Sequence, residues 1–301
     1  MTNIVHYNSD DRISNASSDG HLIRLWLRSK SPNSKDAYAR DIRQFLDFSG
    51  LELSSVKLET IWEWLDELQE RNLTVSTRAR KLASLKSLFS FANKIGYLSF
   101  NVGAAVSLPN IPDLLAQRIL TEQDLHLILD TANSQRNSVL LKLFYATGAR
   151  VSELSVLRWE HVRQNNRPGK DRESIITLVG KGSKSRNVIV PVSMSSVLKQ
   201  LNEAEQTDGY GTALDPVFRS AKGGFLSRHQ MWRIVKKAAA TSGVRGGVSP
   251  HWLRHAHASH SLDRGAPTHL VQETLGHKSL STTSRYTHAR PDDSSGKYLD
   301  V

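Results

Sequence analysis

The sequence contains no cysteine, and this absence excludes several kinds of chemistry. Disulfide bonds, thiolate zinc sites and cysteine nucleophiles all need a residue that the chain does not have, and such a composition fits a reducing cytoplasm. Apolar runs are short as well. Residues 1–20 are polar where a signal peptide would be apolar, and no later run approaches the ~18 residues needed to span a membrane. We therefore expect a soluble protein of the cytoplasm with no membrane partner.

Acidic residues are outnumbered by basic ones. The chain has 40 Lys and Arg against 29 Asp and Glu, which gives a net charge of +11 and a pI near 9.9. This excess favours a polyanionic partner, with nucleic acid as the leading candidate, although a basic protein need not bind any anion specifically. A length of 301 residues with 39% hydrophobic content predicts two folded domains, each large enough to bury its own core.

The N-terminal third of the chain predicts a small helical domain. Residues 1–18 are expected to be disordered. Apolar residues then recur at helical spacing in four segments, at 20–30, 34–48, 56–71 and 75–95. The last segment also contains four cations, Arg78, Arg80, Lys81 and Lys86. These fit either a solvated face or a surface laid on DNA phosphates.

A linker is expected after this domain. Pro109 and Pro112 interrupt a stretch that sustains no period, so residues 101–119 are predicted to join two domains. The remaining chain is divided into a second domain at 120–291 and a C-terminal tail at 292–301.

The second domain is predicted to be mainly helical, with a small antiparallel sheet. Two β-branched runs, at 174–179 and 187–192, flank GKGSKSR, which indicates a hairpin with a basic tip. Helices are expected around this hairpin, from 121 onward and at 136–148, 150–158, 194–205 and 228–241. Ser249 and Pro250 supply an N-cap and a proline at the first helical position, so a further helix should open at His251.

The start of this last helix is a candidate site for chemistry. His251 and Arg254 lie three apart where free backbone amides and the helix dipole favour an anion, and arginine can grip phosphate oxygens; capping or surface roles are the alternative. His251 and His255 also have the spacing of two metal ligands, but the glutamate of a zinc protease motif is missing. We expect no metal there, and we expect His255, His257 and His260 to be packing or helix-face residues.

Side chains elsewhere fit the same kind of site. Arg150 follows Gly148 and precedes Glu153, which can orient its guanidinium, with an ordinary surface pair as the alternative. GKGSKS lacks the spacing of a phosphate-binding P-loop, so ATP hydrolysis has no support, but its lysines can serve as proton donors. Tyr286 stands nine residues after His277. Forming a phenolate at pH 7 costs about 4 kcal/mol, so on its own this tyrosine favours packing over chemistry.

The combination of these motifs resembles the tyrosine recombinases, the phage integrase family. TGARVSEL, HWLRH and LGHKSLSTTSRYTH each match a family motif, and GKGSKSRNVIVP is similar to the family's lysine hairpin. The likeness is strong over 120–290, while 20–100 resembles the family's core-binding domain in architecture alone. It implies a two-domain DNA clamp, mainly α with a small antiparallel β-sheet in the C-terminal domain, of the simpler Xer-type or small-integrase form.

The resemblance implies that the protein cuts and rejoins DNA. Tyr286 would attack the scissile phosphate, forming a 3′-phosphotyrosine and freeing a 5′-hydroxyl, and a 5′-hydroxyl from another duplex would then rejoin the strands. The covalent link keeps the phosphodiester energy, so neither ATP nor a metal cofactor is required. Integration, excision and resolution of DNA all fit this chemistry.

The same resemblance assigns roles to the residues around the phosphate. Arg150 and Arg254 would neutralise the non-bridging oxygens, and His277 would hydrogen bond to the phosphate. His251 would act as general base on the tyrosine. Glu153 would orient the site from behind these side chains.

The hairpin and the helical domain would supply the remaining contacts. Lys181 is the expected general acid, with Lys184 on the same hairpin as the alternative. DNA contacts are expected from basic side chains in both domains, namely Arg78, Arg80, Lys81, Lys86, Lys184 and Arg186. The partner would be double-stranded DNA with specific recombination sites, bound by a homo- or hetero-tetramer in which Tyr298 and Leu299 of the tail pack on a neighbouring protomer.

Two other functions remain open on the residues alone. A type IB topoisomerase shares the chemistry but reseals the same strand and relaxes DNA. A non-catalytic DNA-binding accessory protein would not use the site, although the intact set of six residues, Arg150, Lys181, His251, Arg254, His277 and Tyr286, argues against it.

Overall fold

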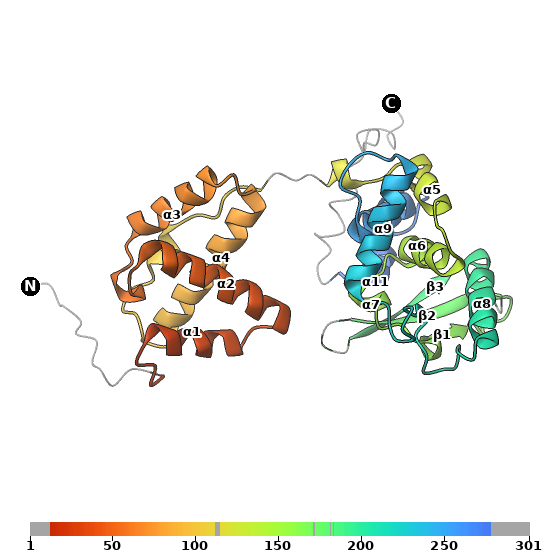
Figure 1. The fold of residues 1–301 in the computed structure, drawn as a ribbon, viewed down its shortest axis with the longest axis horizontal. Coiled ribbons are helices and arrows are strands. Elements are labelled where there is room, and N and C mark those ends of the chain that lie inside the picture. Colours follow the sequence, from red (N-terminus) through yellow and green to blue (C-terminus); the bar gives the residue numbers. More distant parts are fainter. Residues whose placement is uncertain (1–12, 112–114, 171, 181, 183, 278–301) are drawn as a thin grey trace, which may run out of the picture. The chain divides into compact units, whose positions relative to one another are not determined.

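The computed structural model describes residues 13–111, 115–170, 172–180, 182 and 184–277. The chain divides into two compact units, Met1–Pro112 and Asp113–Val301 (Figure 1). That division falls inside the range 101–119 predicted as a linker. Lys181, Tyr286 and the tail at 292–301 lie outside the described residues. In the described part, no helix is both long enough and apolar enough to cross a membrane.

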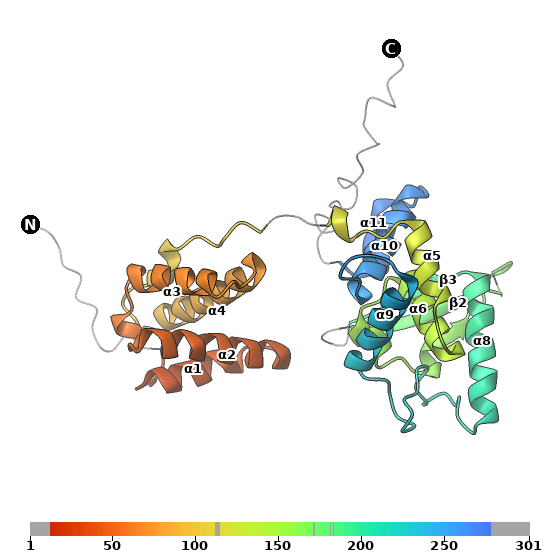
Figure 2. The same ribbon diagram turned by 45° about the horizontal axis from the view of Figure 1, so that its top comes forward.

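The described part of the first unit is built on four main helices. These are α1 (Asp19–Arg28), α2 (Pro32–Ser49), α3 (Leu58–Glu70) and α4 (Val75–Lys94), with a 3₁₀ turn at Leu53–Ser55. Figure 2 shows α1 and α2 side by side, with α3 and α4 packed over them. Their apolar stripes meet in one core, where the rings of Phe45 and Trp64 make an edge contact with centroids 5.0 Å apart. The predicted segments correspond to these helices.

Residues on both sides of these helices belong to the same unit. Ala16 is 3% exposed in its core, and the backbone N–H of Ile13 donates to the Ile95 carbonyl at 3.2 Å. Residues 13–18 therefore pack, contrary to the prediction of disorder over 1–18. Val102 and Val106, at a 3₁₀ helix spanning Val102–Ala105, are buried in the same core, so the first residues of the predicted linker are part of the folded unit.

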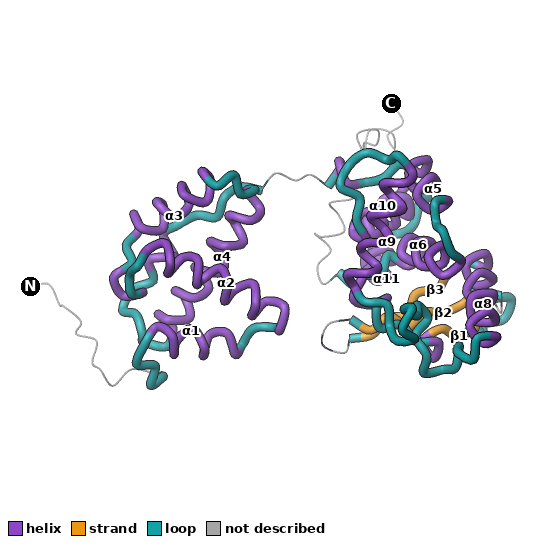
Figure 3. The backbone as a smooth tube through the Cα atoms, in the orientation of Figure 1, coloured by secondary structure: helices purple, strands orange, loops and turns teal. Residues whose placement is uncertain are grey.

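The second unit surrounds a small sheet with helices. Its helices are α5 (Glu122–Asp130), α6 (Gln135–Thr147), α7 (Val151–Leu154), α8 (Val192–Thr207), α9 (Arg228–Ser242), α10 (Pro250–Asp263) and α11 (Thr268–Leu275), with 3₁₀ turns at Ala116–Arg118 and Trp159–His161. Strands β1 (Val162–Gln164), β2 (Ser174–Val179) and β3 (Ser185–Val190) pair antiparallel in that order. Figure 3 shows the strands, in orange, in this unit alone among the described residues. The predicted fold class is confirmed.

One face of the sheet is buried, which fixes the hairpin on the unit. Ile176 pairs with Val188 across β2 and β3, and both are buried with Leu178 and Val190 in the core that α6 and α8 complete. The alternation of buried and exposed residues along β3 follows from the pleat, because neighbouring side chains point to opposite faces. The basic hairpin that follows Val179 therefore extends from a strand with a fixed register.

Some elements differ from the sequence prediction. The helix expected at 150–158 ends at Leu154 as α7, and the second strand begins at Ser185 instead of 187. β1 was not predicted, because its three residues are largely exposed and show no apolar alternation. α11 was also missed; it begins directly after Pro267 and ends at Leu275, where Gly276 caps it with a left-handed backbone.

Candidate active site

Gly148 ends α6 and sets the position of Arg150. Its φ of +57° is in the left-handed region, and a Cβ at this position would lie 2.6 Å from Cδ2 of Leu275 and 2.8 Å from Cδ2 of His257. Only glycine fits both the backbone conformation and this close approach. The end of α6 therefore sits directly against α10 and α11, and Arg150 becomes the N-cap of α7 at that junction.

Glu153 is a buried carboxylate that holds Arg150. Its Oε2 accepts the Arg150 backbone N–H at 2.7 Å, and its Oε1 accepts from Nη1 of Arg150 at 3.0 Å. Arg186 adds two further bonds, from Nη1 at 2.7 Å and from Nη2 at 2.9 Å. Burial alone would raise the pKa of Glu153, but these hydrogen bonds and the two positive charges lower it. Glu153 therefore stays ionised, and the ion pair predicted with Arg150 is present.

Arg254 is buried in α10, where it joins two other helix ends. Its side chain donates to the Gly148 carbonyl at 2.5 Å and to the Leu275 carbonyl at 2.7 Å. The residue is only 4% exposed, which contradicts the alternative of a surface or capping group. Arg150 also reaches this junction, because its Nη2 donates to the Gly276 carbonyl at 3.3 Å. Both guanidinium groups thus gather at the C-terminal end of α11.

His251 and His277 lie within the field of these two arginines. Partial burial and the positive charges of Arg254 and Arg150 lower the pKa of His277 to about 4, with smaller contributions from other cations. Burial, Arg254 and Arg150 also lower the pKa of His251. Both imidazoles are therefore neutral at pH 7, so each has one nitrogen able to accept a hydrogen bond or a proton. Four predicted residues, Arg150, His251, Arg254 and His277, are brought together by this arrangement.

The remaining histidines of α10 have structural contacts. His257 is bonded through Nδ1 to the Tyr145 carbonyl at 2.7 Å, and burial lowers its pKa to about 4. His260 lies between the Tyr145 hydroxyl, at 3.1 Å from Nδ1, and the Leu120 carbonyl, at 2.9 Å from Nε2. His255 shares with His251 the lining of a pocket of about 440 Å³. Among the described residues, no group of three His, Asp or Glu side chains is placed to hold a metal ion.

The basic residues predicted on α4 are mostly engaged inside the first unit. Lys81 is 5% exposed and bonds to Asp41 and Gln44, while Lys86 donates to the Gly103 carbonyl at 2.7 Å. Their ammonium groups neutralise a buried carboxylate and cap a 3₁₀ helix, so both are engaged inside the unit, which does not favour the predicted DNA contact.

The other predicted DNA contacts divide into exposed and engaged side chains. Arg78 bonds to Gln69, and Arg80 pairs with Asp41 while remaining exposed. Lys184 is exposed on the hairpin. Arg186 is instead held by Glu153, with its side chain 15% exposed.

A basic face on α9 was missed by the sequence analysis. Met231, Val235 and Ala238 are buried, while Arg233 and Lys237 are exposed on the opposite face, with Lys236 at its edge and Arg228 exposed in the first turn. Trp232 is 43% exposed among them, with His229 stacked on it and Nζ of Lys236 5.4 Å from its ring. α9 packs beside α7, which begins at Arg150. The helical spacing of the apolar residues in RHQMWRIVKK was the signal that could have identified this face.

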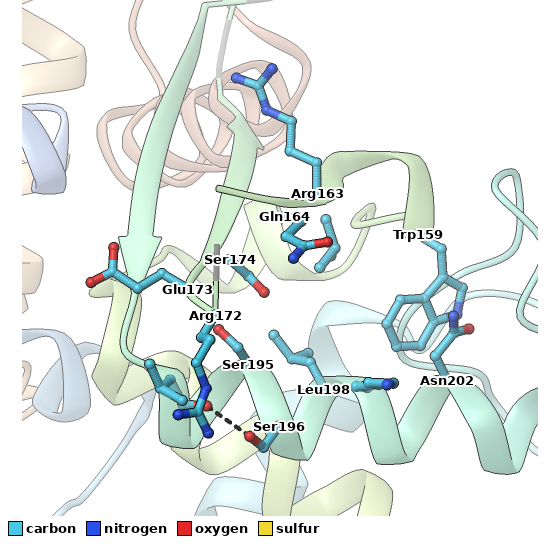
Figure 4. A pocket seen from close by; sticks show the side chains of 13 residues that line it. Trp159, Arg163, Gln164, Arg172, Glu173, Ser174, Ser195, Ser196, Leu198 and Asn202 are labelled. Carbon is cyan, nitrogen blue, oxygen red and sulfur yellow. Dashed lines mark hydrogen bonds between the residues drawn. The ribbon is translucent and has the colours of Figure 1, made fainter. Parts of the chain in front are cut away.

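A cleft of about 500 Å³ lies away from these residues, between the start of the sheet and α8 (Figure 4). Trp159, Arg163, Glu173 and Ser195 are among its lining side chains, and no predicted catalytic residue lines it. The cleft is therefore separate from the arginine and histidine cluster.

Comparisons with known proteins cover both units. The model of the phage integrase family matches residues 118–292, and that of the phage integrase N-terminal SAM-like domain matches residues 19–96. Tyrosine recombinase XerD of Pseudomonas aeruginosa is 32% identical over 282 residues, which are 90% of this chain and 91% of the relative. Tyrosine recombinase XerC of Thermodesulfovibrio yellowstonii is 34% identical over 267 residues, 86% of each chain.

Solved structures show the same architecture. A post-cleavage complex of the XerH site-specific recombinase bound to a palindromic difH substrate has a TM-score of 0.72 at 25% identity, covering 91% of this chain and 82% of that one. A lambda integrase dimer bound to a COC′ core site has a TM-score of 0.73 at 19% identity, covering 92% and 95%, which is a likeness of fold.

Proposed function

Because this chain belongs to the phage integrase family and is a tyrosine-type site-specific recombinase, we propose that it cuts and rejoins DNA through a 3′-phosphotyrosine on Tyr286. Named recombinases among its relatives favour recombination over the relaxation expected of a type IB topoisomerase, and over a non-catalytic accessory role. Its DNA partner carries specific recombination sites. Integration, excision and resolution share this chemistry.

The gathering of two guanidinium groups and two neutral imidazoles is the observation that supports the proposal. Arg150 and Arg254 bring positive charge to the end of α11, and both lower the pKa of His277. Glu153 offsets part of this charge, but it is shared between Arg150 and Arg186, so the cluster stays net positive. A phosphodiester carries one negative charge on two non-bridging oxygens, which matches the positive charge of two neighbouring guanidinium groups.

The roles of the individual residues follow from their protonation states. Arg150 and Arg254 neutralise the charge that grows on the phosphate oxygens in the transition state. His251, neutral at pH 7, takes the proton from the Tyr286 hydroxyl, and His277 hydrogen bonds to the phosphate. Lys181 protonates the leaving 5′-oxygen, with Lys184 on the same hairpin as the second candidate.

Phosphotyrosine chemistry conserves the energy of the broken bond. Attack by the Tyr286 oxygen forms a new phosphodiester as the old one breaks, and the later attack by a 5′-hydroxyl reverses the exchange. The numbers of phosphodiester bonds before and after are equal, so no nucleotide hydrolysis is needed.

DNA contacts outside the site are proposed on the basic face of α9. Arg233 and Lys237 are on the exposed side of a helix that packs beside α7, with Lys236 at its edge and Arg228 in its first turn, and exposed Trp232 adds an aromatic surface beside them. Lys184 and Arg80 are the exposed candidates retained from the sequence. We further propose a homo- or hetero-tetramer on DNA, with Tyr298 and Leu299 of the tail packed on a neighbouring protomer.

A covalent trapping experiment tests the catalytic proposal. Nicked duplexes with randomised arms, which release a short strand after cleavage, are incubated with the full chain, and DNA that stays attached after denaturation is sequenced. We expect adducts with a common sequence from the wild type and from Tyr210→Phe, the matched control, and none from Tyr286→Phe. A wild type that traps no duplex from the pool would contradict the enzymatic function; an adduct persisting in Tyr286→Phe would contradict the nucleophile.

A further inference from the structure

Arg186 connects three segments of the proposed active site, namely β3, α7 and the end of α11. It lies on β3, directly after the basic hairpin, and all three of its guanidinium nitrogens donate to protein oxygens. Nη1 and Nη2 donate to the two carboxylate oxygens of Glu153 at 2.7 and 2.9 Å, and Nε donates to the Thr274 carbonyl at 2.6 Å. Such a fork is more rigid than a single ion pair, because two parallel bonds fix its plane.

The contacts around Arg186 form a closed ring. Glu153 holds the backbone and the side chain of Arg150, and Arg150 donates in turn to the Gly276 carbonyl. Gly276 completes the ring from the other side, since a Cβ there would lie 3.3 Å from Cδ of Arg186. A shift of any one segment therefore changes the position of the other two.

The hairpin that carries the proposed general acid touches the same carboxylate. A Cβ on Gly180, the residue before Lys181, would lie 3.4 Å from Oε1 of Glu153, and the Gly180 N–H donates to the Lys184 carbonyl at 2.8 Å. The base of the hairpin is thus packed on the group that Arg186 clamps.

We infer that Arg186 is a positioning residue. It acts through the buried Glu153 carboxylate and the Thr274 carbonyl to hold Arg150 and His277 at a fixed distance from each other. This inference rests on the proposed function. Arg186 does not contact the phosphate in this account, in contrast to the DNA contact that its sequence position predicts. Removing its fork leaves the charges of Arg150 and Arg254 in place but lets the loop of Arg150 and the end of α11 move apart.

Arg186→Met, Arg186→Lys and a matched control test this role. The control is Arg219→Met, because Arg219 is also a mostly buried arginine of the second unit, bonded to Glu205 at 2.6 Å with its side chain 20% exposed. The substrate is the duplex recovered by covalent trapping with the wild type. We expect Arg186→Met to slow adduct formation at saturating protein on the order of 10²-fold, as small misplacements of catalytic groups do, with less than about a threefold change in DNA affinity. Arg186→Lys should be intermediate, and Arg219→Met should cleave at the wild-type rate.

A second variant separates positioning from simple loss of folding. Arg186→Met leaves Glu153 buried without its main partner, so we combine it with Glu153→Gln, which removes the unpaired charge and still accepts the Arg150 N–H. The double variant should recover the wild-type Tm but stay slow in cleavage. Recovery of both the Tm and the rate would assign Arg186 a purely structural role and overturn the inference.

Two readouts distinguish failure of this inference from failure of the proposed function. The positive charge of Arg186 contributes to the lowered pKa of His277, so this pKa, followed by NMR titration of the His277 ring, should rise in Arg186→Met and stay unchanged in Arg219→Met. Without DNA, hydrogen exchange should accelerate at the amides of Arg150 and His277 in Arg186→Met alone. If the wild type traps no DNA, the proposed function is wrong, but hydrogen exchange still tests whether Arg186 holds Arg150 and His277 in place. If the wild type traps DNA and Arg186→Met cleaves it at the same rate, only the inference about Arg186 is wrong.

Discussion

Arg254 and Gly148 are 106 positions apart in the chain, and the guanidinium of Arg254 donates to the Gly148 carbonyl at 2.5 Å. The same group donates to the Leu275 carbonyl at 2.7 Å, so one buried side chain joins the ends of α6 and α11. Arg150 follows the first of these ends and His277 follows the second. Arg254 therefore fixes the segments that present two other residues of the proposed phosphate site, Arg150 and His277.

Replacing Arg254 with lysine should separate the effect of its positive charge from the effect of its two hydrogen bonds. Lysine keeps the positive charge but cannot donate to both carbonyls in the plane of a fork, so we expect single-turnover cleavage to fall on the order of 10²- to 10³-fold. Adduct formation at saturating protein measures this. Arg264→Lys, at the exposed ion pair with Glu122, should leave the rate unchanged. A wild-type rate in Arg254→Lys would show that its charge alone is sufficient.

Gly148→Ala should destabilise the second unit by more than the replacement of a left-handed glycine by alanine usually does. A Cβ would clash with Leu275 and His257 at 2.6 and 2.8 Å, in addition to the strain of a φ of +57°. Gly243→Ala is the control, since its φ is +74° and its Cβ would meet nothing within 4 Å. Strain alone costs about 1–2 kcal/mol, and overpacking adds about 1–3 kcal/mol. Equal losses in free energy of unfolding, measured with denaturant, would count against the clash.

The stability of the second unit should fall as the medium becomes acidic. The pKa values of His257 and His277 are lowered from 6.5 to about 4 in the folded chain. Between these values the unfolded chain binds more protons than the folded one, so the free energy of unfolding decreases from pH 6.5 down to about pH 4. Denaturation of His257→Gln across this range should show a shallower pH dependence. An unchanged slope would mean that His257 does not supply the linkage.

The basic face of α9 should contribute to DNA affinity without contributing to the fold. Arg233→Gln combined with Lys237→Gln should weaken DNA binding and reduce the salt dependence by roughly one unit of slope for each lost phosphate contact. Arg163→Gln with Lys199→Gln removes the same charge beside the cleft in Figure 4 and is the control. Binding measured over a series of salt concentrations compares the two pairs. Equal weakening in both would indicate a non-specific effect of net charge.

Much of the fold could be predicted from the spacing of apolar and β-branched residues along the chain. Apolar residues at helical spacing located α1 to α4, and the β-branched runs located β2 and β3, because each of these elements buries one face. β1 escaped because its three residues are mostly exposed. The engagement of cations on α4 could not be predicted, since charge in a sequence does not reveal whether a basic side chain pairs with a carboxylate such as Asp41 inside the fold.

The sequence motifs by themselves indicated the family through resemblance, and with it the proposed phosphate chemistry and the candidate residues, because a nucleophile and its cations must be supplied in recognisable local contexts. The tertiary structure decided which side chains meet. It separated Arg186, clamped on Glu153, from the exposed Lys184 two positions away. It also put Arg254 inside the unit, bonded to the ends of two helices. Burial and hydrogen bonding depend on contacts between distant segments, and these do not exist until the chain has folded.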